Sequence, residues 1–221
     1  SVVDLTPQRS RESSHNTDSS RSEFSPFPEE VARLCYELYL RDAMSVFDPF
    51  AGWGERGYYA KAYQTHYTGF DTSPVAIEWA RENYGISNTL ADSLVQDIPA
   101  IDGLITCPPY WNLEKYAGNG IDTAQSWDGF VARLQSIFTR CVEAAPGGAT
   151  FCVMVGEWRK DGVYYDLEYQ TRKIFADLGV PIFDQVVISR KATTKIKVMV
   201  PQAVRLGYTV RLHESLLVFR K

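Results

Sequence analysis

The chain has 221 residues and a formal net charge of −4, with 45% hydrophobic and 23% charged residues. These values are ordinary for a globular protein, and the length suffices for one good hydrophobic core. No apolar run approaches the ~20 residues needed to cross a bilayer, and the first residues lack the apolar stretch of a secretory signal. We therefore expect a cytoplasmic protein that is not attached to a membrane.

The chain divides into an arm and one domain. Residues 1–23 are rich in Ser, Arg and Glu and predict a flexible N-terminal arm, whereas residues 24–221 predict a single domain. Apolar runs of strand length occur at 45–48, 67–71, 90–91, 101–106, 150–155, 182–189 and 215–220. Helical patterns lie between them, at 28–40, 56–64, 74–84, 127–145 and 167–178. This alternation predicts an α/β fold with a doubly wound, mostly parallel sheet.

Acidic residues mark the ends of the first three strands. Asp48, Asp71 and Asp92 stand at or just past these ends, and Gly52 and Gly54 follow the first. Glycines let the backbone approach a ligand, and an acid about 20 residues further on accepts hydrogen bonds from ribose hydroxyls. The pattern predicts a site for an adenosine-type cofactor. NAD and ATP fit less well, because the turn lacks both G-x-G-x-x-G and a Lys-Ser/Thr phosphate cradle.

The fourth strand ends at Cys107-Pro108-Pro109-Tyr110. Two prolines cannot donate backbone hydrogen bonds and fix their own φ, so the strand must give way to a rigid loop. In open α/β sheets ligands bind at the carboxyl ends of the strands, where this loop places a thiol and an aromatic ring. A strand followed by a proline turn and a buried cysteine is the alternative. None of the four cysteines forms a C-x-x-C pair or has metal-ligand spacing with the histidines, so no metal site is predicted.

The charge is unevenly distributed. Residues 185–213 carry six basic residues and no acidic one, which leaves −10 on the remainder. The basic residues are Arg190, Lys191, Lys195, Lys197, Arg205 and Arg211. A basic segment on an acidic body predicts an insertion at 190–211 that contacts a nucleic-acid backbone. A solvated loop with scattered lysines is the alternative.

These motifs resemble a known family. Asp48-Pro49-Phe50-Ala51-Gly52-Trp53-Gly54 is similar to the cofactor motif of S-adenosylmethionine-dependent DNA methyltransferases, and Cys107-Pro108-Pro109-Tyr110 is similar to their catalytic loop. Small bacterial and phage-type enzymes are the nearest in pattern. The resemblance implies a seven-stranded class I methyltransferase fold and S-adenosylmethionine as cofactor. Phe27, Pro28, Asp48, Phe50, Gly52 and Gly54 would line that cofactor, Asp71 would bind its ribose and Asp92 its adenine amino group.

The resemblance also assigns the acceptor side. Tyr110 would stack on a base extruded from DNA. Lys115 follows the loop, and its position predicts a contact to the base or phosphates, with a partly buried aromatic flank as the alternative. Cys107 replaces the Asp, Asn or Ser of amino methyltransferases. A cysteine sulfur is only a weak hydrogen-bond acceptor, whereas a thiolate is a strong nucleophile, which favours methylation of cytosine at carbon 5. Enzymes of that kind similarly carry a Glu after the fifth strand, where Glu157 stands and would activate the ring. An ion pair of Glu157 with Arg159 is the alternative.

Several other functions remain open at the level of sequence. Transfer to an exocyclic amino group, at adenine N6 or cytosine N4, is the nearest alternative. Methyl transfer to RNA or to a protein glutamine is more distant, as is an inactive methyltransferase fold that serves as a binding subunit. The basic segment at 190–211 has only about 20 residues, which is too few for a conventional target-recognition domain. We therefore expect relaxed recognition, or a homodimer mate or specificity partner that supplies it.

Overall fold

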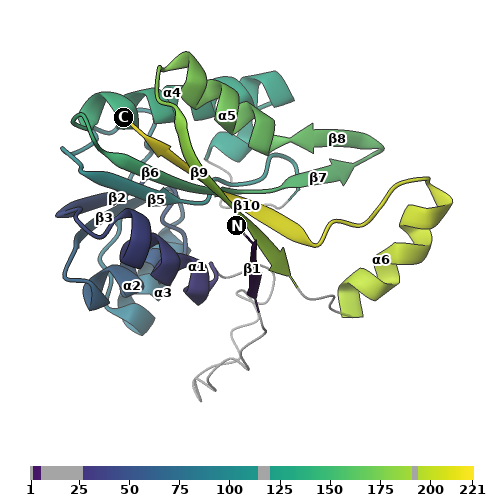
Figure 1. The fold of residues 1–221 in the computed structure, drawn as a ribbon, viewed down its shortest axis with the longest axis horizontal. Coiled ribbons are helices and arrows are strands. Elements are labelled where there is room, and N and C mark those ends of the chain that lie inside the picture. The colour runs from purple at the N-terminus through teal and green to yellow at the C-terminus, as the bar shows by residue number, and fades with distance from the viewer. Residues whose placement is uncertain (1, 6–26, 114–119, 191–193) are drawn as a thin grey trace.

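The computed structural model describes residues 2–5, 27–113, 120–190 and 194–221. Within them, an eight-stranded sheet runs through the middle of the molecule in the order β1-β9-β10-β6-β5-β2-β3-β4 (Figure 1). Its strands are β1 (Val2–Leu5), β2 (Ser45–Asp48), β3 (His66–Asp71), β4 (Thr89–Leu90), β5 (Gly103–Thr106), β6 (Thr150–Val155), β9 (Ile182–Arg190) and β10 (His213–Arg220). Only β10 runs against its neighbours, because it pairs antiparallel with both β6 and β9. The predicted doubly wound and mostly parallel sheet is confirmed.

Helices cover both faces of this sheet (Figure 1). The helices are α1 (Glu29–Leu34), α2 (Glu55–Ala62), α3 (Pro74–Tyr84), α4 (Trp127–Ala144) and α5 (Leu167–Asp177), and a π-helical turn, Cys35–Tyr39, extends α1. Strand residues alternate between two cores. Leu217 and Phe219 of β10 pack with α4 and α5, whereas Leu216 and Val218 pack on the side of α1 and α2. This alternation fixes the register of the buried strands.

Local sequence explains where several of these helices begin and end. Ser73 caps α3 by accepting a hydrogen bond from the Ala76 backbone, Pro74 occupies the first helical position, and Gly85 ends the helix at φ +62°. Ser126 caps α4 in the same way, with Gly129 as the donor. No helix in the described part of the chain is both long and apolar enough to span a membrane.

The N-terminal arm differs from its prediction. Val2–Leu5 forms β1, which pairs parallel with β9 from Val2↔Val187 to Leu5↔Arg190 and adds an eighth strand to the seven expected. These four residues therefore form a strand at the edge of β9, and the β-branched Val2 and Val3 are residues that favour strands. Residues 6–26, the rest of the predicted arm, lie outside the described residues.

Two further elements were not predicted. A separate antiparallel hairpin, β7 (Glu157–Lys160) and β8 (Val163–Asp166), follows β6 and projects from the carboxyl edge of the sheet (Figure 1). The basic segment contains helix α6 (Thr194–Arg205), which stands away from the sheet on the same side as the hairpin (Figure 1). Both elements therefore extend the molecule beside the carboxyl end of β6 and the start of β10.

Candidate active site

The carboxyl ends of four neighbouring parallel strands form one edge. β2 ends at Asp48, β3 at Asp71, β5 at Thr106 and β6 at Val155. The chain order reverses between β2 and β5, since β3 and β4 lie on one side and β6 on the other. Such a switch point opens a crevice outside the strand ends, and this crevice is the usual ligand site of open α/β sheets.

Asp48 is the buried centre of this edge, with no exposed surface. Its Oδ1 accepts hydrogen bonds from the Phe50 backbone (3.1 Å) and from Thr106 Oγ1 (2.7 Å). Its Oδ2 accepts from Tyr67 Oη (2.9 Å) and from the Arg56 guanidinium. Both carboxylate oxygens are thus engaged within the protein. Through its hydrogen bond with the Phe50 backbone, Asp48 supports the glycine turn from inside the protein.

Arg56 is a buried cation next to Asp48. Besides its ion pair with Asp48, it donates a hydrogen bond to the Phe50 carbonyl (2.6 Å), and its guanidinium lies 4.8 Å from the centre of the Phe27 ring. Burial lowers the pKa of Arg56, but the negative charge of Asp48, followed by Tyr67 and Cys107, raises it above its ordinary value. Phe27 is itself buried, with Pro28 just before α1.

The glycine turn leaves space for a ligand. Gly52 has φ +53°, and among the described residues a Cβ built on it would meet only the Phe50 carbonyl, at 3.9 Å. Gly54 has φ +85°, and its Cβ would lie only 2.7 Å from that of Ala80, so it serves close packing against α3. Of the two glycines, Gly52 offers the open face that an adenosine-type cofactor requires.

Two acids border this turn. Asp71 accepts hydrogen bonds from the backbone N–H groups of Gly52 (2.7 Å) and Ser73 (2.8 Å), which hold its carboxylate beside the open face. Burial raises the pKa of Asp71, although these two hydrogen bonds oppose the shift. Asp92, after β4, is partly exposed and accepts a hydrogen bond from the Leu94 backbone (2.9 Å). The residues present therefore fit an adenosine-type group.

The proline loop lies at the end of β5. Cys107 is partly exposed, Pro108 is buried, and Pro109 and Tyr110 are partly exposed. Tyr110 Oη donates to Glu214 Oε1 (3.0 Å), and a Cβ on Gly156 would lie 3.2 Å from the same hydroxyl. The Tyr110 ring packs edge-on against Trp158 at 5.1 Å between centroids. The loop is therefore fixed by residues that follow β6 and begin β10.

An aromatic cluster supports this loop. Trp111 donates an indole hydrogen bond to the Ala124 carbonyl (2.7 Å) and packs against Trp127 and Tyr165. Trp158 stacks on Tyr165 at 5.3 Å between centroids. The cluster joins the proline loop, α4 and the β7–β8 hairpin into one packed unit. It keeps Tyr110 in a defined orientation at the strand edge.

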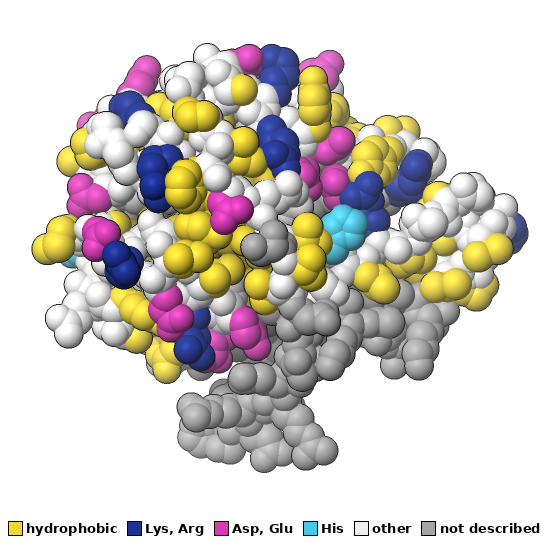
Figure 2. All heavy atoms as spheres, viewed as in Figure 1, with side chains coloured by type: hydrophobic (Ala, Val, Ile, Leu, Met, Phe, Trp, Pro, Cys, Tyr) yellow, Lys and Arg dark blue, Asp and Glu magenta, His cyan; other side chains and the backbone are white. Residues whose placement is uncertain are grey.

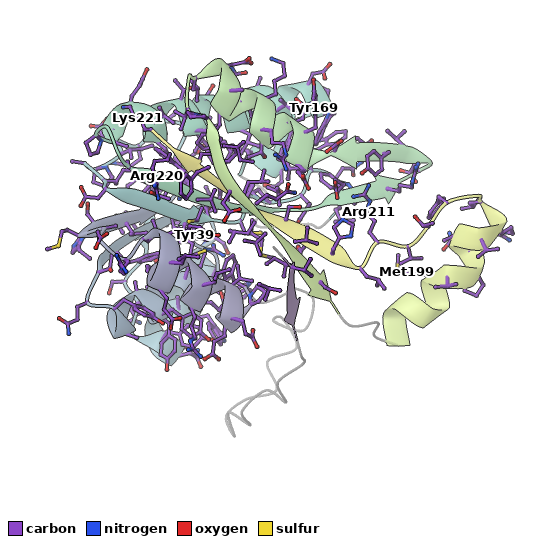
Figure 3. All side chains as sticks on the ribbon, in the orientation of Figure 1. Tyr39, Tyr169, Met199, Arg211, Arg220 and Lys221 are labelled. Atoms are coloured by element: carbon purple, nitrogen blue, oxygen red, sulfur yellow. The ribbon has the colours of Figure 1, made fainter. Side chains whose placement is uncertain are left out.

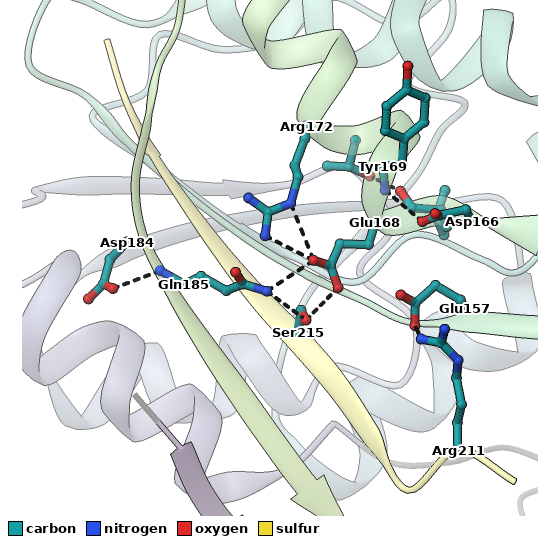
Figure 4. Close-up of polar contacts among 11 residues, drawn as sticks. Glu157, Asp166, Glu168, Tyr169, Arg172, Asp184, Gln185, Arg211 and Ser215 are labelled. Carbon is teal, nitrogen blue, oxygen red and sulfur yellow. Dashed lines mark hydrogen bonds and ion pairs between the residues drawn. The ribbon is translucent and has the colours of Figure 1, made fainter. Parts of the chain in front are cut away.

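Glu157 pairs with a different residue from the one considered above. Its carboxylate binds the guanidinium of Arg211, and its side chain is only 9% exposed (Figure 4). Arg159, in contrast, lies over the rings of Tyr164 and Tyr208. Glu157 follows Gly156, which lies against the Tyr110 hydroxyl of the proline loop. One of the Glu157 carboxylate oxygens, however, already accepts a hydrogen bond from Arg211.

A second carboxylate organises the strands behind the hairpin. Glu168 of α5 accepts hydrogen bonds from Ser215 Oγ (2.6 Å), Gln185 Nε2 (3.0 Å) and Arg172 Nη2 (2.9 Å) (Figure 4). Burial alone raises the pKa of Glu168, but the hydrogen bonds from Ser215, Arg172 and Gln185 outweigh it and hold the pKa below its ordinary value. This network fastens α5 to β9 and β10.

The predicted nucleic-acid contacts remain predictions. Lys115 and Lys191 lie outside the described residues. Arg190 ends β9, and Lys195 and Lys197 lie in α6, but the side chains of these three lie outside the description. Arg205 is the last residue of α6 and is exposed. Sequence reasoning missed Thr106, Glu214 and the hairpin. An Asp161-Gly162 pair between Lys160 and Val163 is the usual signal for a tight hairpin turn, and both residues have positive φ.

No protein-family model matches the sequence, and no curated protein matches it either. Solved structures with a similar fold are numerous. The N-methyltransferase NodS from Bradyrhizobium japonicum is 14% identical with a TM-score of 0.60, over 87% of this chain and 94% of that one. The 1,6-didemethyltoxoflavin-N1-methyltransferase from Burkholderia thailandensis, solved with S-adenosylhomocysteine, is 16% identical with a TM-score of 0.51, over 87% and 77%.

A third similar structure is the [4+2]-cyclase SpnF, which is 15% identical with a TM-score of 0.59, over 87% of this chain and 80% of that one. Together with the strand order, these similarities show that the chain has the Rossmann-like fold of class I S-adenosylmethionine-dependent methyltransferases. A cyclase among the neighbours shows that this fold alone does not fix the reaction. The function must therefore be argued from the site.

Proposed function

We propose that the protein is an S-adenosylmethionine-dependent DNA methyltransferase that modifies cytosine at carbon 5. One observation carries the proposal: the open glycine turn with Asp71 and the Cys107 loop stand at neighbouring strand ends, joined through Asp48. A cofactor on the turn and a base on the loop would then meet over the crevice between β2 and β5.

The cofactor would be held by residues around the turn. The open face over Gly52 would receive it, the Asp71 carboxylate would accept hydrogen bonds from ribose hydroxyls, and the partly exposed Asp92 would take the adenine amino group. The similar structure that contains S-adenosylhomocysteine supports this choice. When bound, the cofactor supplies an electrophilic methyl group.

Cys107 would supply the nucleophile. Its thiolate would form a bond to carbon 6 of cytosine, which makes carbon 5 electron-rich enough to take the methyl group. Loss of the carbon 5 proton to water and elimination of the thiolate would then restore the ring. Cys107 is partly exposed at the end of β5, where a base on the loop would meet it. Tyr110, held by Glu214, would stack on the extruded base.

Transfer to an exocyclic amino group is the second candidate, and Glu157 favours it. A carboxylate bound by Arg211 is poorly placed to serve as the ring-activating acid that carbon 5 chemistry uses. In that case the loop would position an amino nitrogen beside the methyl donor, and Cys107 would not form a bond. The two candidates use the same cofactor site and differ only in the role of the thiol.

DNA that contains 5-fluorocytosine separates the two candidates. Fluorine cannot leave as a proton does, so carbon 5 chemistry predicts a covalent protein–DNA adduct that depends on S-adenosylmethionine and survives denaturing electrophoresis. The same DNA with ordinary cytosine should give no adduct. Cys107→Ser should abolish both adduct and product. Product formation by Cys107→Ser or Cys107→Asp, without an adduct, would overturn carbon 5 transfer and select the amino candidate.

A further inference from the structure

The carboxylate of Glu214 touches the acceptor loop directly. Glu214 is the second residue of β10, and its Oε1 accepts the hydrogen bond of Tyr110 Oη at 3.0 Å. A Cβ built on Gly156, which directly follows β6, would lie 3.1 Å from Glu214 Cγ and 3.2 Å from the same hydroxyl. The end of β6, the start of β10 and the proline loop therefore meet at this carboxylate.

Glu214 points to the same side of the sheet as Cys107. Leu216 and Val218 of β10 belong to the core on the side of α1 and α2, and Cys107 packs against that core. Successive side chains of a strand alternate between its two faces, so Glu214, two residues before Leu216, shares the face of Leu216. Because β10 runs antiparallel to β6, its first residues lie at the carboxyl edge of the sheet, where β5 also ends. A carboxylate and a thiol thus face one side of this edge.

A base that stacks on the Tyr110 ring would bring its edge to Glu214. A pyrimidine and a phenol are both six-membered aromatic rings, so a base over Tyr110 extends to the hydroxyl that Glu214 binds. A carboxylate can accept several hydrogen bonds, and Glu214 can therefore bind this hydroxyl and an amino group together. The exocyclic amino group of cytosine is a donor that Glu and Asp accept from when proteins read bases. Position and chemistry thus suit Glu214 to contact that group.

Glu157, the carboxylate expected from the sequence, is less suited to this contact. It binds the guanidinium of Arg211, which lies beside the hairpin (Figure 3). Strand alternation sets Glu157 on the opposite side of the hairpin from Trp158, whose ring packs against Tyr110. Figure 2 shows Lys and Arg side chains next to Asp and Glu side chains around the hairpin. The negative charge of Glu157 is therefore already compensated, and its side chain lies on the side away from the Tyr110 ring.

We propose that Glu214 recognises the target base by accepting a hydrogen bond from its exocyclic amino group. Tyr110 stacks on the base and, through its hydroxyl, holds the carboxylate at the edge of the base. The contact selects an amino group, because the carbonyl oxygen that uracil carries at the same position would face a negative charge. Glu214 thereby takes the place at the base that the sequence assigned to Glu157. This inference rests on the proposed function, because it assumes that a DNA base enters the proline loop.

The choice between cytosine and uracil tests this assignment. Single-stranded DNA, and the same DNA after bisulfite conversion of cytosine to uracil, are incubated with the protein and methyl-labelled S-adenosylmethionine. The readout is the ratio of the initial rates at which label enters 5-methylcytosine and thymine. Glu214→Gln should lower this ratio about 10- to 100-fold, because an amide can donate to the uracil carbonyl and a carboxylate cannot. Glu157→Gln removes the carboxylate bound by Arg211 and should leave the ratio unchanged.

A second variant tests the same contact through the residue that holds the carboxylate. Tyr110→Phe keeps the aromatic ring and removes the hydroxyl that binds Glu214, so it should lower the ratio by a smaller factor. Thermal unfolding of each variant verifies that the fold is retained. If Glu214→Gln does not fold, the ratio in Tyr110→Phe decides, and an unchanged value there overturns the assignment.

The outcomes separate this inference from the proposed function. An unchanged ratio in Glu214→Gln, while the wild-type protein forms 5-methylcytosine, would overturn the role of Glu214 and leave the function standing. If the wild type instead methylates an exocyclic amino group, carbon 5 transfer is overturned. Loss of that product in Glu214→Gln but not in Glu157→Gln would then support the contact, and its retention would overturn it. Absence of any methylated base in DNA would overturn both.

Discussion

The two sides of the crevice are held together in different ways. On the cofactor side, Asp48 and Arg56 form a buried ion pair whose side chains are 0% and 6% exposed, and Tyr67 and Thr106 complete the hydrogen bonds of Asp48. On the acceptor side, Glu157 binds Arg211, whose side chain is 35% exposed, and cation–aromatic contacts fix the hairpin. A buried network is costly to break, whereas half-exposed contacts each contribute little. The ion pair of the cofactor side is therefore costly to break, whereas on the acceptor side the Arg211 contacts of the hairpin can adjust while the aromatic cluster keeps the proline loop in place.

Asp48→Asn should have the largest effect. It leaves the buried Arg56 without its carboxylate, and removal of one partner of a buried ion pair costs about 3–5 kcal/mol of unfolding free energy. Glu78→Gln, which breaks the exposed pair with Arg81, serves as the matched control and should lower the free energy of unfolding far less. Urea denaturation measures both. Equal losses in the two variants would remove the distinction between the two sides.

Substitution of one glycine on each side of the crevice compares how tightly the two sides are packed. A Cβ on Gly69 would lie 2.4 Å from Asn88 Oδ1 and 2.7 Å from the Ala51 Cβ, so Gly69→Ala should cost about 1–3 kcal/mol. A Cβ on Gly156 would lie 3.1 Å from Glu214 Cγ and 3.2 Å from Tyr110 Oη, both on side chains that can move. Gly156→Ala should cost less than about 1 kcal/mol and still lower activity through Tyr110. Greater destabilisation by Gly156→Ala would contradict a more adaptable acceptor side.

The lowered pKa of Glu168 predicts how the stability of the fold depends on pH. Its folded-state pKa is lowered, so its stabilising contribution is present above the unfolded-state value of about 4.3 and is lost as pH falls through the folded-state pKa. Glu168→Gln should lose about 1–2 kcal/mol at neutral pH, because charged hydrogen bonds to Ser215 and Arg172 are weakened. Thermal unfolding at pH 7 and pH 3 should show that the difference from wild type shrinks in acid. A constant difference would be inconsistent with this linkage.

Arg211→Gln should have only a small effect on stability. The Glu157 pair is partly exposed, so we expect a loss of at most about 1 kcal/mol, and less at high salt. DNA modification should nevertheless slow down, because the hairpin loses a contact to the segment before β10. Chemical denaturation at two salt concentrations, together with an activity assay, checks both statements. A loss above about 3 kcal/mol would place this pair in the same class as Asp48 and Arg56.

The sequence predicts the cofactor side well because its signals are local. Strand 45–48, helix 74–84 and strand 150–155 coincide with β2, α3 and β6, since each has a clear hydrophobic period or cap. Gly52 and Asp71 were selected by their position after strand ends, and both border the open turn. Position relative to a strand was therefore enough to select these two residues, and their part in cofactor binding stays a prediction.

The acceptor side depends on contacts between distant segments, which no local pattern reveals. Tyr110 bonds to Glu214, 104 residues away, and Arg211 reaches Glu157, 54 residues away. The pairing of β1 with β9 is equally remote and was hidden by the polar composition of the arm. The Asp161-Gly162 turn was the one local signal for the hairpin. Only the structure shows which residue each of these charged side chains binds.

Mass analysis of nucleosides from DNA incubated with the protein and S-adenosylmethionine tests the central claim most directly. The account predicts 5-methylcytosine, absent without the cofactor and absent with Cys107→Ser. Cytosine methylated at N4 or adenine methylated at N6 would keep the cofactor side and replace the role assigned to Cys107. Unmodified DNA, with the methyl group found on RNA, on protein or nowhere, would contradict the claim that this crevice joins the cofactor to a DNA base.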